Sequence, residues 1–270
     1  MKPHHTRSRA YTLAVSLTAT ILAFGLSGAP AQAAPVDTTA KQATVYVGLG
    51  DSYAAGTGGG ASAPPCFQSA AAYPTLLGGT NLGCFGATTT DVAVVATNNA
   101  ALLGSASDIS LTVGGNDVGT GAVTAACVPD PLGAACAAAV ESTRTALTQL
   151  PAKIAGLVAY LRSLAPTADI AVTGYPRLFT VTNTMPPQQQ ALAATFNSMA
   201  DALNAAIAAG SRAAGARFVD VTQRFLDHGI GSDKPWINFD GNVLNPENFH
   251  PNAAGYNNGY RTAVNAALKR

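Results

Sequence analysis

The sequence is poor in charge, and the charge that it has is balanced. Lysine, arginine, aspartate and glutamate make up 11% of its 270 residues. The first 33 residues hold three of the 15 basic side chains and none of the 14 acidic ones, which leaves 12 against 14 in the remainder. Such a surface offers no basic patch to nucleic acid or to an anionic membrane. We therefore expect no nucleic-acid partner.

The apolar run near the start is too short to cross a membrane. It covers residues 11–26, whereas a spanning helix needs ~20 apolar residues. Basic residues precede it, and Ala31-Gln32-Ala33 follows it as a small-x-small cleavage site. This pattern predicts a secretory signal peptide over residues 1–33, no stable membrane insertion, and an extracellular chain of residues 34–270. We expect that chain to form a single domain and a monomer.

Several motifs of other enzyme classes are missing. No Gly-x-Ser-x-Gly pentapeptide occurs, which removes the usual signature of the α/β-hydrolases. The segment from Gly48 to Tyr53 lacks the third glycine of a dinucleotide-binding loop. The cysteines lack the close spacing of a zinc site. We therefore expect neither a metal nor an organic cofactor.

The cysteines predict disulfides. All four, Cys66, Cys84, Cys127 and Cys136, follow the predicted cleavage site. An even number of cysteines in an exported chain favours two disulfides. Four cysteines allow three pairings, and the shortest loops favour Cys66–Cys84 and Cys127–Cys136. The second pair would close the proline-rich segment 128–133.

Strand and helix patterns alternate along the chain. Short β-branched runs predict strands over residues 43–49, 108–113, 169–173 and 216–221. Apolar residues recur at three- and four-residue steps over 147–164 and 192–207, and a last helix is predicted over 253–268. This alternation predicts an α/β fold with a parallel sheet covered on both faces. Ligands of such sheets lie beyond the carboxyl ends of the strands, so the residues there are the candidates for function.

Two of these strand-end residues carry acid–base chemistry. Ser52 directly follows the first predicted strand, and a serine hydroxyl needs a base before it can act as a nucleophile. Only His228 and His250 follow the predicted signal peptide. His228 lies in a turn-like stretch, whereas His250 stands at the mouth of the last predicted helix, where Pro251 can begin it. His250 is therefore the candidate base, although Gly-Asp-Ser alone is also typical of a turn.

Two further residues could stabilise an oxyanion, the negative charge that forms when an ester carbonyl is attacked. Gly86 could present its backbone N–H at close approach, and Asn116, after the second clear strand, could offer its side-chain amide. Either residue type is also common in turns.

Taken in order, Gly50-Asp51-Ser52-Tyr53, Gly86, Gly114-Gly115-Asn116-Asp117 and His250-Pro251-Asn252 resemble the four blocks of the SGNH (GDSL-type) hydrolase superfamily. The closest resemblance is to its secreted bacterial lipase and esterase branch. It implies a flavodoxin-like three-layer α/β/α sandwich with Ser52 as nucleophile and His250 as base. It also implies an oxyanion hole formed by the N–H groups of Ser52 and Gly86 and the Asn116 side chain.

The resemblance leaves the third member of a catalytic triad open. Many members have an acidic residue three positions before the histidine, and that position is Glu247 here. In relatives of this branch a backbone carbonyl can orient the imidazole instead, which leaves a Ser–His dyad. The branch often has a third disulfide, for which this chain has no cysteines.

The implied activity is that of a secreted carboxylic ester hydrolase acting on lipid or fatty-acyl esters through an acyl-enzyme. Apolar residues expected near the crevice favour such esters: Tyr53, Pro64, Pro65, Tyr175, Pro176, Leu178 and Phe179. The alternatives are an acetyl esterase acting on polysaccharides, a phospholipase of the same fold, and a secreted glycan-binding module without catalysis. With a histidine base, the rate should fall as the pH drops through about 6–7.

Overall fold

A five-stranded parallel sheet lies at the centre of the described part of the chain. The computed structural model describes residues 44–269, so the predicted signal peptide, residues 1–33, lies outside the described residues. The strand order is β2-β1-β3-β4-β5. The bounds are β1 (Tyr46–Gly50), β2 (Thr80–Asn81), β3 (Asp108–Thr112), β4 (Asp169–Thr173) and β5 (Arg217–Val219).

The predicted strands are present, and the pattern missed one. β4 has the predicted bounds, and β1 and β3 are fully buried. Burial on both faces explains why β1 shows no polar alternation. In β3 the polar residues Asp108, Ser110 and Thr112 alternate with apolar ones, although all five residues are buried. β5 is shorter than predicted. β2 was not predicted because it comprises only Thr80 and Asn81, a polar pair too short to show a period.

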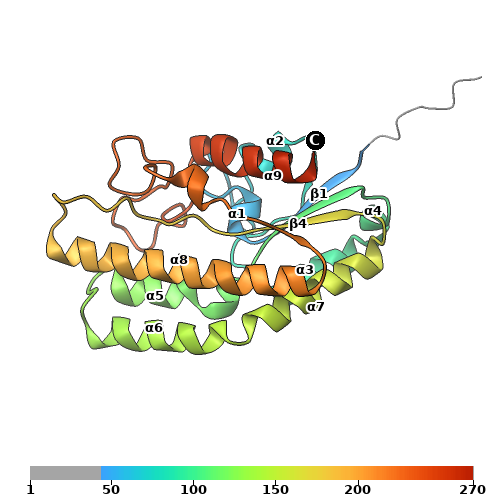
Figure 1. Cartoon of the computed structure of the whole chain (residues 1–270). Coiled ribbons are helices and arrows are strands. Elements are labelled where there is room, and N and C mark those ends of the chain that lie inside the picture. Colours follow the sequence, from blue (N-terminus) through green and yellow to red (C-terminus); the bar gives the residue numbers. More distant parts are fainter. Residues whose placement is uncertain (1–43, 270) are drawn as a thin grey trace, which may run out of the picture. The chain divides into compact units, whose positions relative to one another are not determined.

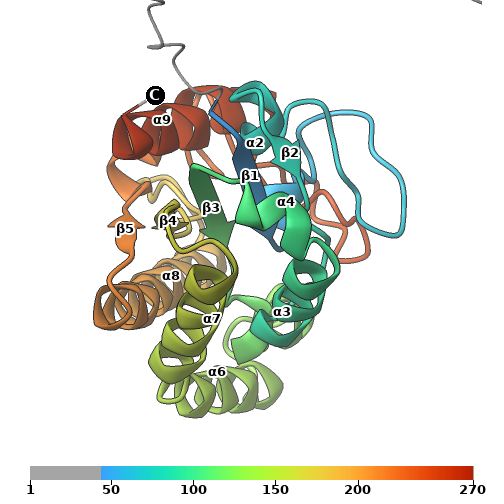
Figure 2. The same ribbon diagram turned by 90° about the vertical axis from the view of Figure 1, so that its right-hand side faces the viewer.

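Helices cover both faces of the sheet. They are α1 (Ser52–Ala55), α2 (Tyr73–Leu76), α3 (Thr89–Asn98), α4 (Ala100–Gly104), α5 (Thr120–Cys127), α6 (Ala134–Leu147), α7 (Leu150–Leu164), α8 (Pro187–Ala213) and α9 (Thr262–Leu268). The 3₁₀ turns η1 (Asn116–Val118) and η2 (Thr222–Phe225) and the π-helical stretch η3 (Gly255–Arg261) complete the set. Figures 1 and 2 show α3, α7 and α8 on one face and α2, η3 and α9 on the other. The predicted three-layer α/β/α sandwich is confirmed.

The predicted helix over 147–164 is in fact divided between two helices. Leu147 ends α6, and α7 begins at Leu150 with Pro151 in its first turn. Proline has no N–H and is tolerated in a helix only in the first turn, so Pro151 marks the start of a new helix. The apolar period continues across the break between α6 and α7 and therefore does not reveal it. The pattern over 192–207 lies wholly inside α8.

The strand order brings the ends of β1 and β3 together. The chain passes from β1 to β2 on one side and returns to β3 on the other, and sheets of this order bind ligands at that reversal. A Cβ atom on Gly50, whose φ is +137°, would lie 2.0 Å from the Thr112 carbonyl oxygen. Only glycine permits this approach, which the Asp51 N–H secures by donating to Thr112 O at 2.8 Å.

The four cysteines form two disulfides. Cys66 bonds to Cys84, and Cys127 bonds to Cys136. This is the pairing that loop length favours. The second disulfide joins the end of α5 to the start of α6 and closes the segment 128–133 between them.

Candidate active site

Ser52 stands at the point where β1 gives way to α1. Asp51 caps this short helix, since its Oδ1 accepts a hydrogen bond from the Tyr53 N–H at 2.9 Å. Ser52 is the first helical residue, so its own N–H has no acceptor inside the helix. Its side chain and N–H are thus both available at the crevice beyond the sheet.

The His250 imidazole contacts Ser52 directly. Nε2 lies 2.7 Å from Ser52 Oγ, and Nδ1 lies 3.0 Å from the Asn248 carbonyl oxygen. A carbonyl can only accept, so in the neutral ring Nδ1 carries the hydrogen and Nε2 accepts the Ser52 hydroxyl. This is the protonation pattern of a base ready to remove the serine proton.

The Glu247 carboxylate is not the hydrogen-bond partner of the His250 ring. The atom that bonds to Nδ1 belongs to the main chain of Asn248, not to the Glu247 carboxylate. Glu247 takes part through its backbone, with its N–H donating to Asn245 Oδ1 at 3.0 Å and its carbonyl accepting from the His250 N–H at 3.2 Å. This geometry fits the second possibility left open above, in which a backbone carbonyl orients the imidazole.

A strained backbone presents His250. Phe249, the residue before it, has a φ of +63°, which residues other than glycine rarely adopt. The Tyr53 hydroxyl donates to the Phe249 carbonyl oxygen. Tyr53 adjoins Ser52, and Phe249 adjoins His250. Two hydrogen bonds, one between Tyr53 and Phe249 and one between Ser52 and His250, therefore hold the two segments together.

Burial keeps the imidazole neutral. It lowers the pKa of His250 to about 4, although the hydrogen bond with the Asn248 carbonyl raises this pKa in part. Two aromatic rings pack beside the imidazole, with centroids 5.1 Å away at Tyr53 and 5.8 Å away at Phe85. The expected fall in rate at pH 6–7 is therefore revised to a lower pH, because the free base persists down to about pH 4.

The two predicted oxyanion donors flank the same crevice. Gly86 has a φ of +78°, and no atom lies within 4 Å of where its Cβ would be. Asn116 Nδ2 donates to the Ala87 carbonyl at 3.0 Å, which orients the amide and leaves its second hydrogen for another acceptor. Asp117 reinforces this link, since its carboxylate accepts from the Thr89 N–H at 2.9 Å and the Thr89 hydroxyl at 2.6 Å.

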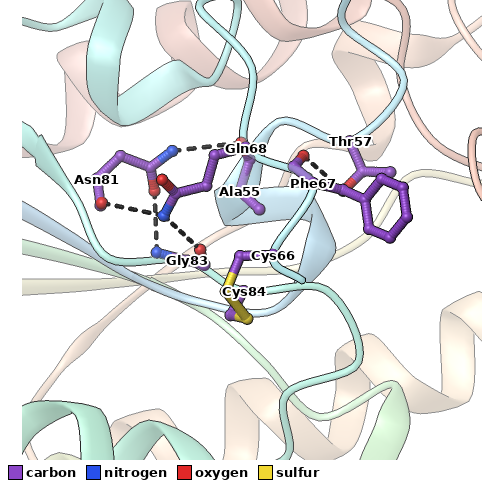
Figure 3. The surroundings of a disulfide bond; sticks show 8 residues. All are labelled: Ala55, Thr57, Cys66, Phe67, Gln68, Asn81, Gly83 and Cys84. Carbon is purple, nitrogen blue, oxygen red and sulfur yellow. Dashed lines mark hydrogen bonds between the residues drawn. A yellow bond between two sulfur atoms is a disulfide. The ribbon is translucent and has the colours of Figure 1, made fainter. Parts of the chain in front are cut away.

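The Cys66–Cys84 disulfide anchors the segment that carries Gly86. Cys84 N–H donates to Gly50 O at 3.0 Å, and Phe85 N–H donates to Cys66 O at 3.1 Å. Figure 3 shows the surrounding hydrogen bonds, in which Gln68 Nε2 donates to the Gly83 carbonyl at 2.8 Å. The loop is thereby fixed against the end of β1.

Buried hydrogen bonds link the residues that follow β1, β3 and β4. Asp51 Oδ2 accepts from the Tyr175 hydroxyl, and the same hydroxyl accepts from the Gly115 N–H at 3.2 Å. Burial raises the pKa of Asp51 to about 7, against the hydrogen bonds from Tyr175 and Tyr53 that lower it. The sequence indicated Tyr175 only as a pocket residue, because nothing in its local pattern reveals a partner 124 positions away.

Ser52, Gly86, Asn116 and His250 line one cavity of about 330 Å³. It continues between α5, α6 and α8, where its apolar lining includes Val118, Leu147, Leu178, Phe196, Met199 and Leu203. The sequence placed the helical members only on predicted helices, since a stripe facing a cavity has the same period as one facing the core.

Four of the seven apolar residues expected at the crevice line this cavity: Tyr53, Tyr175, Pro176 and Leu178. The other three do not. Pro64 and Pro65 are exposed. Phe179 packs instead against Phe196 and Phe249, with ring centroids at 5.9 and 6.4 Å.

Comparison with known proteins decides the family. The model of the GDSL-like Lipase/Acylhydrolase family matches residues 49–257, which include Ser52, Gly86, Asn116 and His250. The chain belongs to this family. The resemblance to the SGNH (GDSL-type) hydrolases is thereby confirmed.

Proteins similar to this GDSL-like chain share most of its length. A lipase of Streptomyces rimosus is 33% identical, over 97% of this chain and 98% of that protein. The crystal structure of the extracellular lipase from Streptomyces rimosus has a TM-score of 0.74 at 31% identity, over 83% of this chain and 100% of that chain. The crystal structure of phospholipase A1 from Streptomyces albidoflavus NA297 has a TM-score of 0.74 at 30% identity, over 83% of this chain and 99% of that chain.

Within the described residues, the second histidine lies away from the cavity lining. His228 stacks on Trp236 with ring centroids 3.8 Å apart, and its Nδ1 lies 2.9 Å from the Lys234 carbonyl oxygen.

Within residues 44–269 no group of three or more histidine, cysteine or acidic side chains is placed to hold a metal ion. Among the helices described, none is long and apolar enough to cross a membrane.

The His250 pKa can be measured directly. We expect the Hε1 resonance of His250 to titrate with a midpoint near pH 4, because burial disfavours the charged ring. NMR of the histidine-labelled protein, assigned by comparison with His250→Gln, checks this. A midpoint near the ordinary value of about 6.5 would show that the imidazole is hydrated rather than buried.

Proposed function

We propose that the protein is a secreted carboxylic ester hydrolase that cleaves lipid or fatty-acyl esters through an acyl-enzyme on Ser52. The observation that carries this proposal is the 2.7 Å contact between Ser52 Oγ and His250 Nε2 at an apolar cavity. In this proposal residues 1–33 are the signal peptide, and residues 34–270 form one monomeric domain. The extracellular lipase of Streptomyces rimosus supports both the secretion and the substrate class.

The proposed reaction begins with proton transfer. His250 Nε2 takes the Ser52 proton while the oxygen attacks the ester carbonyl, and the negative charge passes to the carbonyl oxygen. The N–H groups of Ser52 and Gly86 and the free hydrogen of the Asn116 amide bind that oxyanion. His250 then gives its proton to the leaving alcohol. Water, activated by the same imidazole, releases the acid from Ser52.

The Asn248 carbonyl takes the orienting role that an acidic residue has in a triad. It fixes the tautomer that presents a free Nε2 lone pair to Ser52, and it does so without a charge. The imidazolium formed during turnover donates through Nδ1 to the same carbonyl. In this proposal Glu247 has no direct part in catalysis.

The cavity favours an acyl chain over an acetyl group as the bound acid. Its apolar walls continue well beyond the reacting atoms, from Val118 near Asn116 to Met199 and Leu203 on α8. Burying methylene groups there supplies binding energy of about 0.8 kcal/mol for each CH₂. Phospholipids are the second candidate substrate, because one structure of the same fold at 30% identity is a phospholipase A1.

Replacing the proposed nucleophile should abolish turnover. We expect Ser52→Ala to lower kcat on a p-nitrophenyl ester by at least about 10³-fold, since no other hydroxyl lies against His250 Nε2 in this proposal. Labelling with a serine-reactive phosphonate, followed by peptide mass spectrometry, should place the adduct on Ser52. An adduct on any other residue, or turnover by Ser52→Ala, would refute the assignment of Ser52. A binding module would instead give neither turnover nor an adduct in the unmodified protein.

Replacing Glu247 should have little effect. We expect Glu247→Gln to keep kcat within about threefold, because the group that holds Nδ1 is a backbone carbonyl. His250→Gln serves as the matched control and should lose activity as Ser52→Ala does. A loss of kcat by Glu247→Gln beyond about 100-fold would instead place its carboxylate in the mechanism.

Filling the cavity should shorten the preferred acyl chain. Ala200 lies on α8 and lines the cavity, so we expect Ala200→Leu to lower the dodecanoyl rate relative to the butanoyl rate by at least about tenfold. Ala194→Leu, an exposed position on the same helix, is the control. Kinetics over a series of p-nitrophenyl esters measure the ratio. An unchanged ratio in both variants would mean that the acyl chain lies elsewhere.

A further inference from the structure

Exposed apolar side chains gather at the mouth of the cavity. Among the described residues, the large hydrophobic side chains left in solvent include Phe85, Val243 and Leu244, and all three line the cavity. Leu244 is 86% exposed, more than any of the others. Single exposed apolar residues need no explanation, but a group beside one opening marks a contact surface.

Leu244 and Val243 lie on a loop that is built from polar hydrogen bonds. In this tip loop, residues 240–248, the Asp240 carboxylate accepts from the Asn242 N–H at 2.8 Å and from Asn245 Nδ2 at 2.7 Å. The same carboxylate also accepts from Asn248 Nδ2. One acidic side chain thus joins both ends of the loop.

The same hydrogen bonds hold Leu244 outward. Its N–H donates to Asn242 Oδ1 at 3.0 Å, and the Asn245 N–H donates to Asn242 O at 3.0 Å. Turns made of asparagine, aspartate and glycine normally expose polar tips. Here a well-bonded turn places two aliphatic side chains in water, so their exposure follows from the loop's own hydrogen bonds.

The tip loop is continuous with the proposed base. The Asn248 side chain belongs to the loop's hydrogen bonds, while its carbonyl oxygen lies 3.0 Å from His250 Nδ1. Phe239, the residue before the tip loop and 37% exposed, packs on Phe249 with ring centroids 5.0 Å apart. A surface that binds the tip loop would therefore lie directly over the site.

Charge selects the kind of surface. The tip loop holds Asp240 and Glu247 and has no lysine or arginine. Apart from tyrosines, the titratable residues that line the cavity are Asp51 and His250. Anionic lipid is attracted by basic side chains, which this mouth does not offer, whereas an uncharged lipid surface needs only apolar contact.

We propose that Val243 and Leu244 insert into the surface of aggregated, uncharged lipid and so bring the cavity mouth onto that surface. The inference rests on the proposed function in one respect, namely that the lipid esters enter the cavity from this surface. Two aliphatic side chains, with Phe85 and Phe239 beside them, give a weak and reversible association rather than a stable anchor.

The test uses binding, so that it does not depend on turnover. The parent is the exported chain, residues 34–270, with Ser52→Ala, and the probe is vesicles of phosphatidylcholine, separated by flotation. We expect Leu244→Asp in this background to lower the partition coefficient at least tenfold, because a charge cannot enter the apolar layer. Leu132→Asp, at a position 73% exposed but outside the cavity lining, should stay within twofold of the parent.

A second variant reports the insertion of residue 244 into the lipid and keeps an apolar side chain there. The sequence has one tryptophan, so Leu244→Trp adds a second indole. The emission of this added indole should shift to shorter wavelength when vesicles are added. Leu132→Trp should show no shift. Thermal unfolding of every variant establishes that it is folded.

Several results would overturn the proposal. These are equal partition of Leu244→Asp and the parent, an equal loss in Leu132→Asp, and no shift in Leu244→Trp. Tighter binding to phosphatidylglycerol than to phosphatidylcholine would show an electrostatic contact instead. A lipid-free dimer that Leu244→Asp dissociates would identify a second copy as the occupant. Hydrolysis of soluble butanoyl ester by the unmodified protein is measured separately, so failure of the lipid contact and failure of the proposed function are distinguishable.

Discussion

The site depends on one close approach between two strand ends. At Gly50 the missing Cβ atom lets the Thr112 carbonyl of β3 come against the end of β1, and the Asp51 N–H bonds to it at 2.8 Å. Ser52 and Asn116 follow these two ends by only a few residues. Strand order alone would make them neighbours. The contact at Gly50 draws the two strand ends closer, and both residues line the same cavity.

Burial shapes the electrostatics around this contact. It moves the pKa of His250 down to about 4 and that of Asp51 up to about 7, each in the direction that favours the neutral form. The polar atoms are nevertheless satisfied, because tyrosine hydroxyls and backbone groups bond to them. Tyr175 serves Asp51, and Tyr53 serves the main chain beside His250. A site of this kind has many hydrogen bonds but carries little net charge.

The sequence predicted the sheet, its buried strands and the residues at their ends, because apolar runs and glycine are local signals. It could not locate the cavity, since Phe196 and Met199 share the period of core residues. Nor could it choose between Glu247 and a carbonyl for His250. That choice depends on the left-handed turn at Phe249, which the Tyr53 hydroxyl holds from 196 positions away. Signals that cross such separations are visible only when the chain is folded.

The orientation of His250 by the Asn248 carbonyl has a consequence for how this chain can vary. A main-chain oxygen cannot be removed by substituting a side chain, and it does not titrate in the range where a carboxylate would. In the proposed mechanism the group that orients the base is therefore set by the path of the backbone rather than by the identity of one side chain. Such a site tolerates drift at the neighbouring side chains, yet it is vulnerable to any insertion that changes the turn.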